Sequence, residues 1–198
     1  MTLTARRGGG APVVLRPLRG RDRRQWEALR AANTEWLRPW EATSPEPMAT
    51  ALPFRQLVRH FDHEASQGRL QPFAIESGGQ LVGQMHLFGI AWGSLRSASA
   101  GYWVAESVAG QGIVPLALAA ACDHAFLALG LHRVEVNIRP SNVASLRVVE
   151  KLGFREEGMR QRYLHIDGEW RDHQSFALTR EDLGRTSLVE SWNRLSGL

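Results

Sequence analysis

The feature that most constrains the fold is a glycine turn within residues 104–115, which read Val-Ala-Glu-Ser-Val-Ala-Gly-Gln-Gly-Ile-Val-Pro. Gly110 and Gly112 lack a Cβ atom, so they permit positive φ angles and let a bulky group approach the main chain. Pro115 suits the first turn of a helix, where its missing N–H costs no hydrogen bond. The segment therefore predicts a strand, a turn and a helix whose uncovered N–H groups favour an anion.

Two common phosphate-binding motifs are excluded by the residues present. A nucleoside-triphosphate loop ends in Gly-Lys followed by Ser or Thr, whereas the single lysine of this chain is Lys151. A dinucleotide fingerprint requires a third glycine three residues after Gly112, and Pro115 stands there. Two interpretations stay open at this point: a loop for another phosphorylated ligand, or a plain Gly-Pro turn.

Length and composition narrow the class of protein. A chain of 198 residues predicts one α/β domain with a sufficient core. Cys122 is the only cysteine, which excludes a disulfide framework and a zinc cluster, and its alanine-rich surroundings predict a buried side chain. The net charge is +4, but the arginines are scattered, so we expect no specific nucleic-acid binding. Without an apolar leader or spanning run, we expect a cytoplasmic protein with no membrane contact.

The pattern along the chain predicts a disordered tail over residues 1–11, the α/β domain over residues 12–180 and a helical tail over residues 181–198. Asp22 is expected to cap the first helix. The predicted strands cover residues 13–16, 73–76, 81–87, 98–105 and 133–138.

A two-residue hairpin is predicted at Asp167-Gly168, between two extended runs. This register would pair Tyr163 with Asp172. It would also pair His165 with Trp170 and place all four side chains on one face. That face is either a substrate wall or ordinary cross-strand packing, and the pattern leaves both open.

A second group of residues gives the glycine turn a context. It comprises Gly130, the strand at 133–138, Arg-Pro-Ser-Asn-Val-Ala-Ser at 139–145 and Glu-Lys-Leu-Gly-Phe at 150–154. The order of strand, glycine loop, helix, strand, Asn-capped helix and Gly-Phe resembles the GNAT superfamily of acyl-CoA-dependent N-acyltransferases over most of the chain. Trp-Leu-Arg-Pro-Trp at 36–40 and Gly-Glu-Trp-Arg-Asp-His at 168–173 are similar to its Rim branch, which acetylates ribosomal-protein N-termini.

This resemblance implies an α/β (α+β) fold with a mixed, mostly antiparallel sheet of about seven strands, splayed between the fourth and fifth and flanked by helices. It implies an N-acetyltransferase that uses acetyl-CoA, or another acyl-CoA, and needs no metal. The acceptor would be a primary amine, such as the N-terminal α-amine of a ribosomal protein. The protein would be a monomer or a homodimer.

The resemblance also assigns residues to the acyl donor. Main-chain N–H groups of the glycine loop would hold the pyrophosphate, and a strand bulge at residues 104–106 would free amides for the pantetheine arm and the acyl carbonyl. Asn142 would contact the pantetheine in addition to capping its helix, which is its simpler interpretation. The Ser145 hydroxyl would meet the CoA sulfur. The expected donor-binding residues are Val104, Ala105, Gly110, Gln111, Gly112, Ile113, Val114, Asn142 and Ser145.

The general base is harder to place, because the chain departs from its relatives. Asn137, Val149 and Arg162 stand where Rim-type enzymes carry acidic or tyrosine side chains. Glu106 and Asp172 are the remaining candidates, with Glu106 favoured, and Ser145 completes the expected catalytic set. The acceptor side is expected to be lined by Trp36, Trp40, Tyr163 and Trp170.

Two other interpretations remain. Without an assigned base, the chain could be a non-catalytic CoA-binding module. Within the enzyme class, it could acylate a small-molecule amine or use succinyl-CoA, for which a basic side chain facing the acyl pocket would be the indication. A metal site at His60 and His63, with Glu64 beside them, is not expected. Histidines at this spacing on an exposed helix face are usually solvated, and no further ligand is placed nearby.

Overall fold

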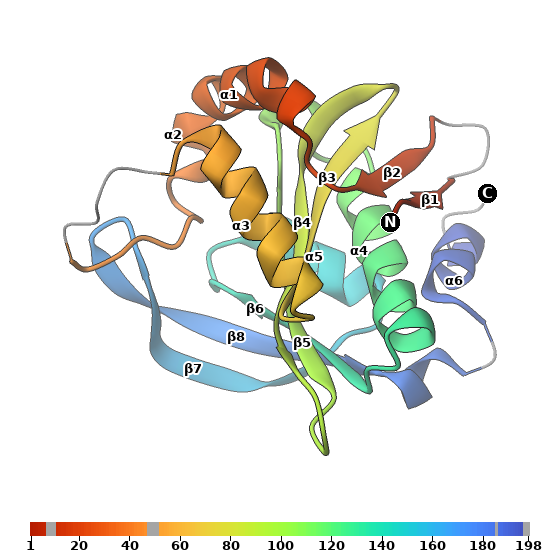
Figure 1. Ribbon diagram of the computed structural model, residues 1–198. Coiled ribbons are helices and arrows are strands. Elements are labelled where there is room, and N and C mark those ends of the chain that lie inside the picture. The colour runs from red at the N-terminus through yellow and green to blue at the C-terminus, as the bar shows by residue number, and fades with distance from the viewer. Residues whose placement is uncertain (7–10, 47–51, 185, 196–198) are drawn as a thin grey trace.

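An open sheet of eight strands runs through the centre of the computed structural model, which describes residues 1–6, 11–46, 52–184 and 186–195 (Figure 1). The strands are β1 (Leu3–Ala5), β2 (Val13–Arg16), β3 (Leu70–Ser77), β4 (Gln80–Ala91), β5 (Ser97–Val104), β6 (Arg133–Ile138), β7 (Arg155–Ile166) and β8 (Glu169–Thr179). The helices are α1 (Arg23–Ala32), α2 (Thr34–Leu37), α3 (Phe54–Ser66), α4 (Ile113–Asp123), α5 (Val143–Lys151) and α6 (Leu188–Leu195). The short helical turns are η1 (Gly20–Asp22), η2 (Glu106–Val108), η3 (His124–Ala128) and η4 (Arg180–Leu183).

The strands follow the order β1-β2-β3-β4-β5-β6-β8-β7 across the sheet. Every neighbouring pair is antiparallel except β5 and β6, which are parallel. That parallel pairing covers only three positions, Ser97 to Ser99 against Arg133 to Glu135. Beyond these positions the two strands diverge. The predicted fourth and fifth strands, at 98–105 and 133–138, correspond to β5 and β6, so the sheet splays where the splay was predicted.

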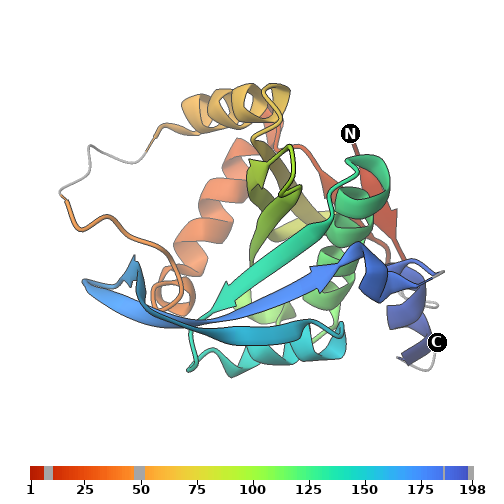
Figure 2. The ribbon, with the colours of Figure 1, turned by 90° about the horizontal axis from the view of Figure 1, so that it is seen from below.

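Helices cover both faces of the β3–β4 half of the sheet (Figure 2). Alternation along β3 sends Phe73 and Ile75 to the face that packs on α4, and Ala74 to the opposite face with α1 and α3. Helix α4 is buried along most of its length, because its alanine-rich surface lets it lie close against the sheet and α6. Cys122 on this helix is fully buried, as predicted. No helix of the described ranges is long and apolar enough to cross a membrane.

Two expectations near the N-terminus need correction. Leu3–Ala5 form strand β1 and pair with β2, although the composition predicts a disordered tail over residues 1–11. Residues 7–10 of that tail lie outside the described residues. Asp22 makes no side-chain cap for α1; its Oδ2 accepts the Arg19 N–H at 2.7 Å instead and closes the η1 turn. The sheet gains its eighth strand from β1.

The β7–β8 hairpin confirms the prediction at its tip and differs further along. Ile166 pairs with Glu169 and His165 with Trp170 around the Asp167-Gly168 turn. The register then shifts between Arg160 and Leu164, so Tyr163 does not pair with Asp172. The prediction that all four side chains share one face is therefore wrong.

The cause of this register shift is visible in the main chain. Arg162 adopts a positive φ of 49°, and its N–H donates to Asp172 Oδ1 at 2.7 Å. The Asp172 side chain thus takes an N–H that would otherwise point at a neighbouring strand.

Candidate functional site

A cleft of about 1080 Å³ runs from the end of β5 to the start of α5. The η2–α4 loop and the first turn of α4 form one side, and residues 141–151 form the other. Trp36 and Trp40 reach it from α2 and the segment after it. The predicted glycine turn therefore lies in the wall of a cleft.

The glycine turn has the geometry expected of an anion site. Gly110 and Gly112 have φ angles of 75° and 78°, in the left-handed region that glycine adopts without strain. Gly112 is the N-cap of α4, and Pro115 lies in the first turn, where it removes no helical hydrogen bond. The Leu116 N–H donates to Gly112 O and makes the first hydrogen bond of the helix. The N–H groups of Ile113 and Val114 lie before it at the helix start, where the helix has no carbonyl oxygen to accept them.

Asn142 begins α5 on the other side of the cleft. Its Oδ1 accepts the N–H of Ser145 at 3.1 Å, which confirms the predicted cap. The carbonyl oxygen of the amide is used in this way, so its NH2 group remains as the donor to the cleft. Ser145 lies in the first turn of α5 and lines the same cleft.

The end of β5 differs from the bulge that was expected at residues 104–106. Val104 pairs regularly with Gly83, and the Ala105 N–H donates to Val82 O at 2.8 Å. Since successive residues of a strand direct their main-chain groups to opposite sides, those of Val104 point away from β4 toward the open gap. Trp36 Nε1 donates to Val104 O at 3.1 Å on that side. The main chain of Val104 thus faces the gap although the strand has no bulge there, whereas the N–H of Ala105 faces β4.

The Glu106 N–H is also unavailable. It donates to Asn33 Oδ1 at 2.9 Å, and the Asn33 amide nitrogen donates to Leu29 O at 2.8 Å. Asn33 lies at the break between α1 and α2, where apolar spacing alone predicts one continuous helix. This side chain connects the helix break to the turn after β5.

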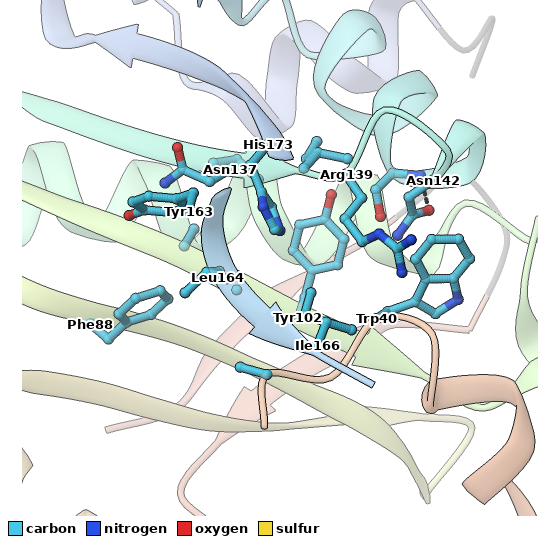
Figure 3. A pocket seen from close by; sticks show the side chains of 16 residues that line it. Trp40, Phe88, Tyr102, Asn137, Arg139, Asn142, Tyr163, Leu164, Ile166 and His173 are labelled. Atoms are coloured by element: carbon cyan, nitrogen blue, oxygen red, sulfur yellow. Dashed lines mark hydrogen bonds between the residues drawn. The ribbon is translucent and has the colours of Figure 1, made fainter. Parts of the chain in front are cut away.

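The smaller cavity is a pocket of about 290 Å³ in the gap where β5 and β6 diverge (Figure 3). Residues of β5, β6, β7 and β8 form its floor and walls, and Trp40 and Ala42 close one side. The Ala42 segment is fixed to the hairpin: Ala42 bridges to Ile166, and the Thr43 N–H donates to His165 O at 2.8 Å.

The cleft and the pocket share Trp40, Tyr102, Asn142 and Ser145. These four residues come from three separate parts of the chain, and together they mark the place where the two cavities meet. Ser145 is the one member of the predicted catalytic set found there. A group bound in the cleft and a group bound in the pocket would face each other across this junction.

Tyr102 at the junction was not predicted from the sequence. Its hydroxyl is buried and has no hydrogen bond of ordinary length among the described residues, although it lies within the influence of the Ser145 side chain. Burial raises the pKa of the Tyr102 hydroxyl well above its usual value, an effect that Ser145 partly opposes. The group therefore stays protonated at neutral pH and can donate a hydrogen bond.

His173 of β8 is a second residue that the sequence did not single out for chemistry. It is only 3% exposed, and it lines the pocket beside Tyr163, whose ring lies 5.6 Å away in an edge-to-face contact (Figure 3). Arg139 also lines the pocket, but its guanidinium donates to Pro39 O and lies over the Trp40 ring at 5.6 Å. His173 lies in the motif at 168–173, and Arg139 lies in the motif at 139–145. Their place in these motifs was the signal by which the sequence could have indicated them.

The other predicted residues lie elsewhere. Glu106 and Asp172 are exposed, and neither lines the cleft or the pocket. Trp170 is 54% exposed and packs on His165, on the face opposite to that of Leu164 and Ile166. The structure thus brings Trp36, Trp40 and Tyr163 to the cavities and leaves Trp170 outside them.

Comparison with known proteins identifies the class. Residues 13–155 match the model of the acetyltransferase (GNAT) domain family. The chain therefore belongs to the GNAT acetyltransferase family and is an N-acetyltransferase, and the fold class predicted from the resemblance is confirmed. The interpretation as a non-catalytic CoA-binding module is not favoured.

Its relatives include Rim-type acetyltransferases of ribosomal proteins. The probable N-acetyltransferase YjcK of Bacillus subtilis (strain 168) is 30% identical over 175 residues, 87% of this chain and 97% of that protein. The ribosomal protein uS5-alanine N-acetyltransferase of Escherichia coli (strain K12) is 28% identical, over 86% of this chain and 89% of that protein. The structure of Mycobacterium smegmatis RimJ in complex with CoA-disulfide matches with a TM-score of 0.90 and 39% identity, over 100% of this chain and 95% of that one.

Proposed function

We propose that the protein transfers the acetyl group of acetyl-CoA to the N-terminal α-amine of a protein, with a ribosomal protein as the favoured acceptor. The observation that carries this proposal is the junction of the two cavities at Trp40, Tyr102, Asn142 and Ser145. Two reactants that enter from opposite sides would meet there with their reacting atoms in contact.

The residues of the cleft fit coenzyme A. The glycine loop with the start of α4 suits a pyrophosphate, because N–H groups and the helix dipole both favour negative charge there. The main-chain N–H of Val104, which points toward the gap, and the amide nitrogen of Asn142 suit the polar groups of a pantetheine arm. A related protein has been solved with a CoA derivative, which supports the same donor here. The thioester supplies an activated acetyl group to the junction.

The lining of the pocket favours a protein N-terminus over a polyamine. No Asp or Glu is found among the described residues that line it, although a polyamine carries several positive charges that need carboxylates. Asn137 and the main chain of β6 offer hydrogen-bonding groups at the splayed edge, where an extended peptide could lie. The E. coli relative named above acts on an N-terminal alanine of a ribosomal protein, which supports the same class of acceptor.

The donor is proposed to be acetyl-CoA and not succinyl-CoA. A succinyl carboxylate would need a free cation near the acyl group, and Arg139 is the arginine that lines the pocket. Its guanidinium is already held by Pro39 O and the Trp40 ring.

The chain's own groups act on the leaving sulfur and on the amine. We propose that the Ser145 hydroxyl, supported by Tyr102, donates a hydrogen bond to the sulfur as the C–S bond breaks. A thiol has a pKa of about 8.5, so the thiolate leaves readily and a hydrogen bond is sufficient help. The acceptor amine must be neutral to attack, and an α-amine with a pKa of about 8 is partly neutral near pH 8.

The experiment that tests this proposal measures free thiol release from acetyl-CoA with a panel of acceptors. Peptides that begin with Ala or Ser should support turnover, and mass spectrometry should place the acetyl group on the α-amine. The matched control is the same peptide with a blocked N-terminus and an internal lysine. Preference for spermidine, for the lysine or for succinyl-CoA would contradict the proposal. An acceptor on ribosomal proteins would also place the enzyme in the cytoplasm.

A further inference from the structure

The proposed reaction needs a general base at the place where the amine would lie. The predicted candidates, Glu106 and Asp172, are exposed and lie outside both cavities. Among the described residues that line the pocket, His173 is the side chain that can accept a proton near neutral pH. On the basis of the proposed function, we propose that His173 Nε2 is the general base that accepts the proton of the attacking amine.

The hydrogen bonds of His173 fix the position of its lone pair. Nδ1 lies 3.0 Å from Arg171 O, and a carbonyl oxygen can only accept, so Nδ1 carries the proton. In the neutral ring the lone pair is then on Nε2. Nε2 is not among the fully buried polar atoms without a partner, and no hydrogen bond occupies it within the described part of the chain. The ring therefore directs a free acceptor toward the pocket in which Figure 3 shows it.

The surroundings keep the ring neutral. Burial is the main cause that lowers the pKa of His173 below its usual value, and the Arg139 charge adds to this effect. The hydrogen bond to Arg171 O and the Asp172 charge oppose it, and the Tyr163 ring covers one side. The net direction is a lowered pKa, so His173 is neutral above about pH 6.5 and ready to accept a proton.

The proposed step balances in atoms and charge. The amine nitrogen forms a bond to the carbonyl carbon, and its N–H proton moves to His173 Nε2. The C–S bond then breaks, and its electron pair goes to the sulfur, which Ser145 stabilises by a hydrogen bond. Once the acetylated peptide has left, His173 releases its proton to water and the neutral ring is restored.

The pH dependence of kcat/KM for an N-terminal peptide provides the test. In the wild type both the α-amine and His173 must be deprotonated, so the slope of log kcat/KM should approach two once the pH falls below the lowered pKa of His173. In His173→Asn the slope should remain near one, and the rate above pH 7 should fall about 100-fold. Imidazole added to His173→Ala should restore part of the rate. A slope that stays at two in both variants would overturn the proposal.

A second readout is independent of turnover. Nitrogen-15 NMR of the imidazole side chains should show His173 protonated at Nδ1 and free at Nε2, with a pKa below the usual histidine value of about 6.5. A ring protonated at Nε2 would overturn the proposal. Acetyl-CoA affinity and the unfolding midpoint of His173→Asn, measured beside those of the control His63→Gln, separate a lost base from a lost fold.

The outcome also distinguishes this inference from the proposed function. If the wild type acetylates no N-terminal peptide, the proposed function fails before His173 is tested. If the wild type is active and the low-pH slope changes in Asp172→Asn or Glu106→Gln instead, the function stands and His173 is not the base.

Discussion

Asn142 Oδ1 accepts the Ser145 N–H at 3.1 Å, so the residue that begins α5 also positions the hydroxyl at the junction of the two cavities. The cap uses the Oδ1 atom of the Asn142 amide and leaves its NH2 group to donate into the cleft. The contributions of Asn142 to helix stability and to donor binding can therefore be separated by substitution.

Asn142→Ser should keep the cap and lose the amide donor. Serine caps helices about as well as asparagine, so the unfolding midpoint should stay near that of the wild type, while Asn142→Ala should lose about 1 kcal/mol. Both variants should bind CoA about tenfold more weakly, because each lacks a hydrogen bond to the ligand. Isothermal titration with CoA measures this. Wild-type affinity in Asn142→Ser would mean that Asn142 is only a cap.

Ser145→Ala should slow turnover by about tenfold and leave measurable activity. One hydrogen bond to a charged sulfur is worth about 1.5 kcal/mol, and the thiolate is a tolerable leaving group without it. Tyr102→Phe removes the neighbouring hydroxyl and should have a similar effect. Because the two hydroxyls are proposed to act together, the double variant should be little slower than either single one. An unchanged kcat in Ser145→Ala would remove that residue from the mechanism.

Gly112→Ala should raise the KM for acetyl-CoA about tenfold. Its φ of 78° costs an alanine about 1 kcal/mol, and the added methyl group would lie at the N-cap of α4, where the pyrophosphate is proposed to bind. Gly79→Ala is the matched control: its φ is 76°, the added Cβ meets nothing within 4 Å, and it lies in the β3–β4 turn. Equal losses of stability with a KM change in Gly112→Ala alone would support the loop as the anion site. A similar KM in both variants would contradict it.

Asp22→Asn should destabilise the fold by about 3 kcal/mol, as expected when one partner of a buried ion pair is removed. Asp22 is 6% exposed, and its Oδ2 lies 2.7 Å from Arg16 Nη1. Burial acts to raise the pKa of Asp22, but the hydrogen bonds from Arg16 and the Arg19 N–H outweigh it and the pKa is lowered. This stabilisation is thus present above about pH 4 and is lost as the pH falls through the folded-state pKa.

Urea unfolding at several pH values measures this effect. Glu27→Gln is the control, because it removes an exposed i,i+4 pair with Arg23 and should cost less than about 0.5 kcal/mol. Equal losses of unfolding free energy in the two variants would show that the buried Asp22 pair stabilises the fold no more than the exposed Glu27 pair.

His86 should make stability depend on pH between about 6.5 and 4. Burial lowers the pKa of His86 to about 4, and its ring packs edge-on against Phe61. In this window the unfolded chain binds the additional proton, so stability is full above pH 6.5 and falls by about 3 kcal/mol as the pH approaches 4. His86→Leu should reduce this slope, while His124 and His173, whose pKa values are also lowered by burial, should retain part of it. An unchanged slope would mean that His86 is protonated in the folded state.

The sequence predicted the parts of the fold that local chemistry determines. The positive φ angles of Gly110 and Gly112, the Asn142 cap and the Asp167-Gly168 turn depend on a few neighbouring residues, and all of them are found. Strand β1 was missed because three residues beside a glycine-rich segment carry no periodic pattern, and the pairing with β2 makes them a strand.

The site required distant contacts that a sequence does not show. The side chain of Asp172 captures the Arg162 N–H and shifts the hairpin register, so Tyr163 lines the pocket while Trp170 packs on His165 outside it. The tautomer of His173 depends on Arg171 O, and the position of the buried Tyr102 hydroxyl beside Ser145 depends on where α5 begins. The Asn33 amide occupies the Glu106 N–H from a helix more than seventy residues away. Each of these contacts is decided by tertiary packing.

The three paired positions of β5 and β6 join the two parts of the sheet, β1–β5 and β6–β8. Both cavities lie across this seam, because the cleft runs from β5 to α5 and the pocket has walls from β5 and from β6–β8. Arg133 sits on the seam and pairs with Glu135 and Glu157, and Arg160 adds a second contact to Glu135. A small rotation about this seam would move the β5 wall of both cavities relative to the walls formed by α5 and β6–β8, and would change the separation of two reactants bound there. We therefore expect substitutions at its charged residues to change kcat more than either KM.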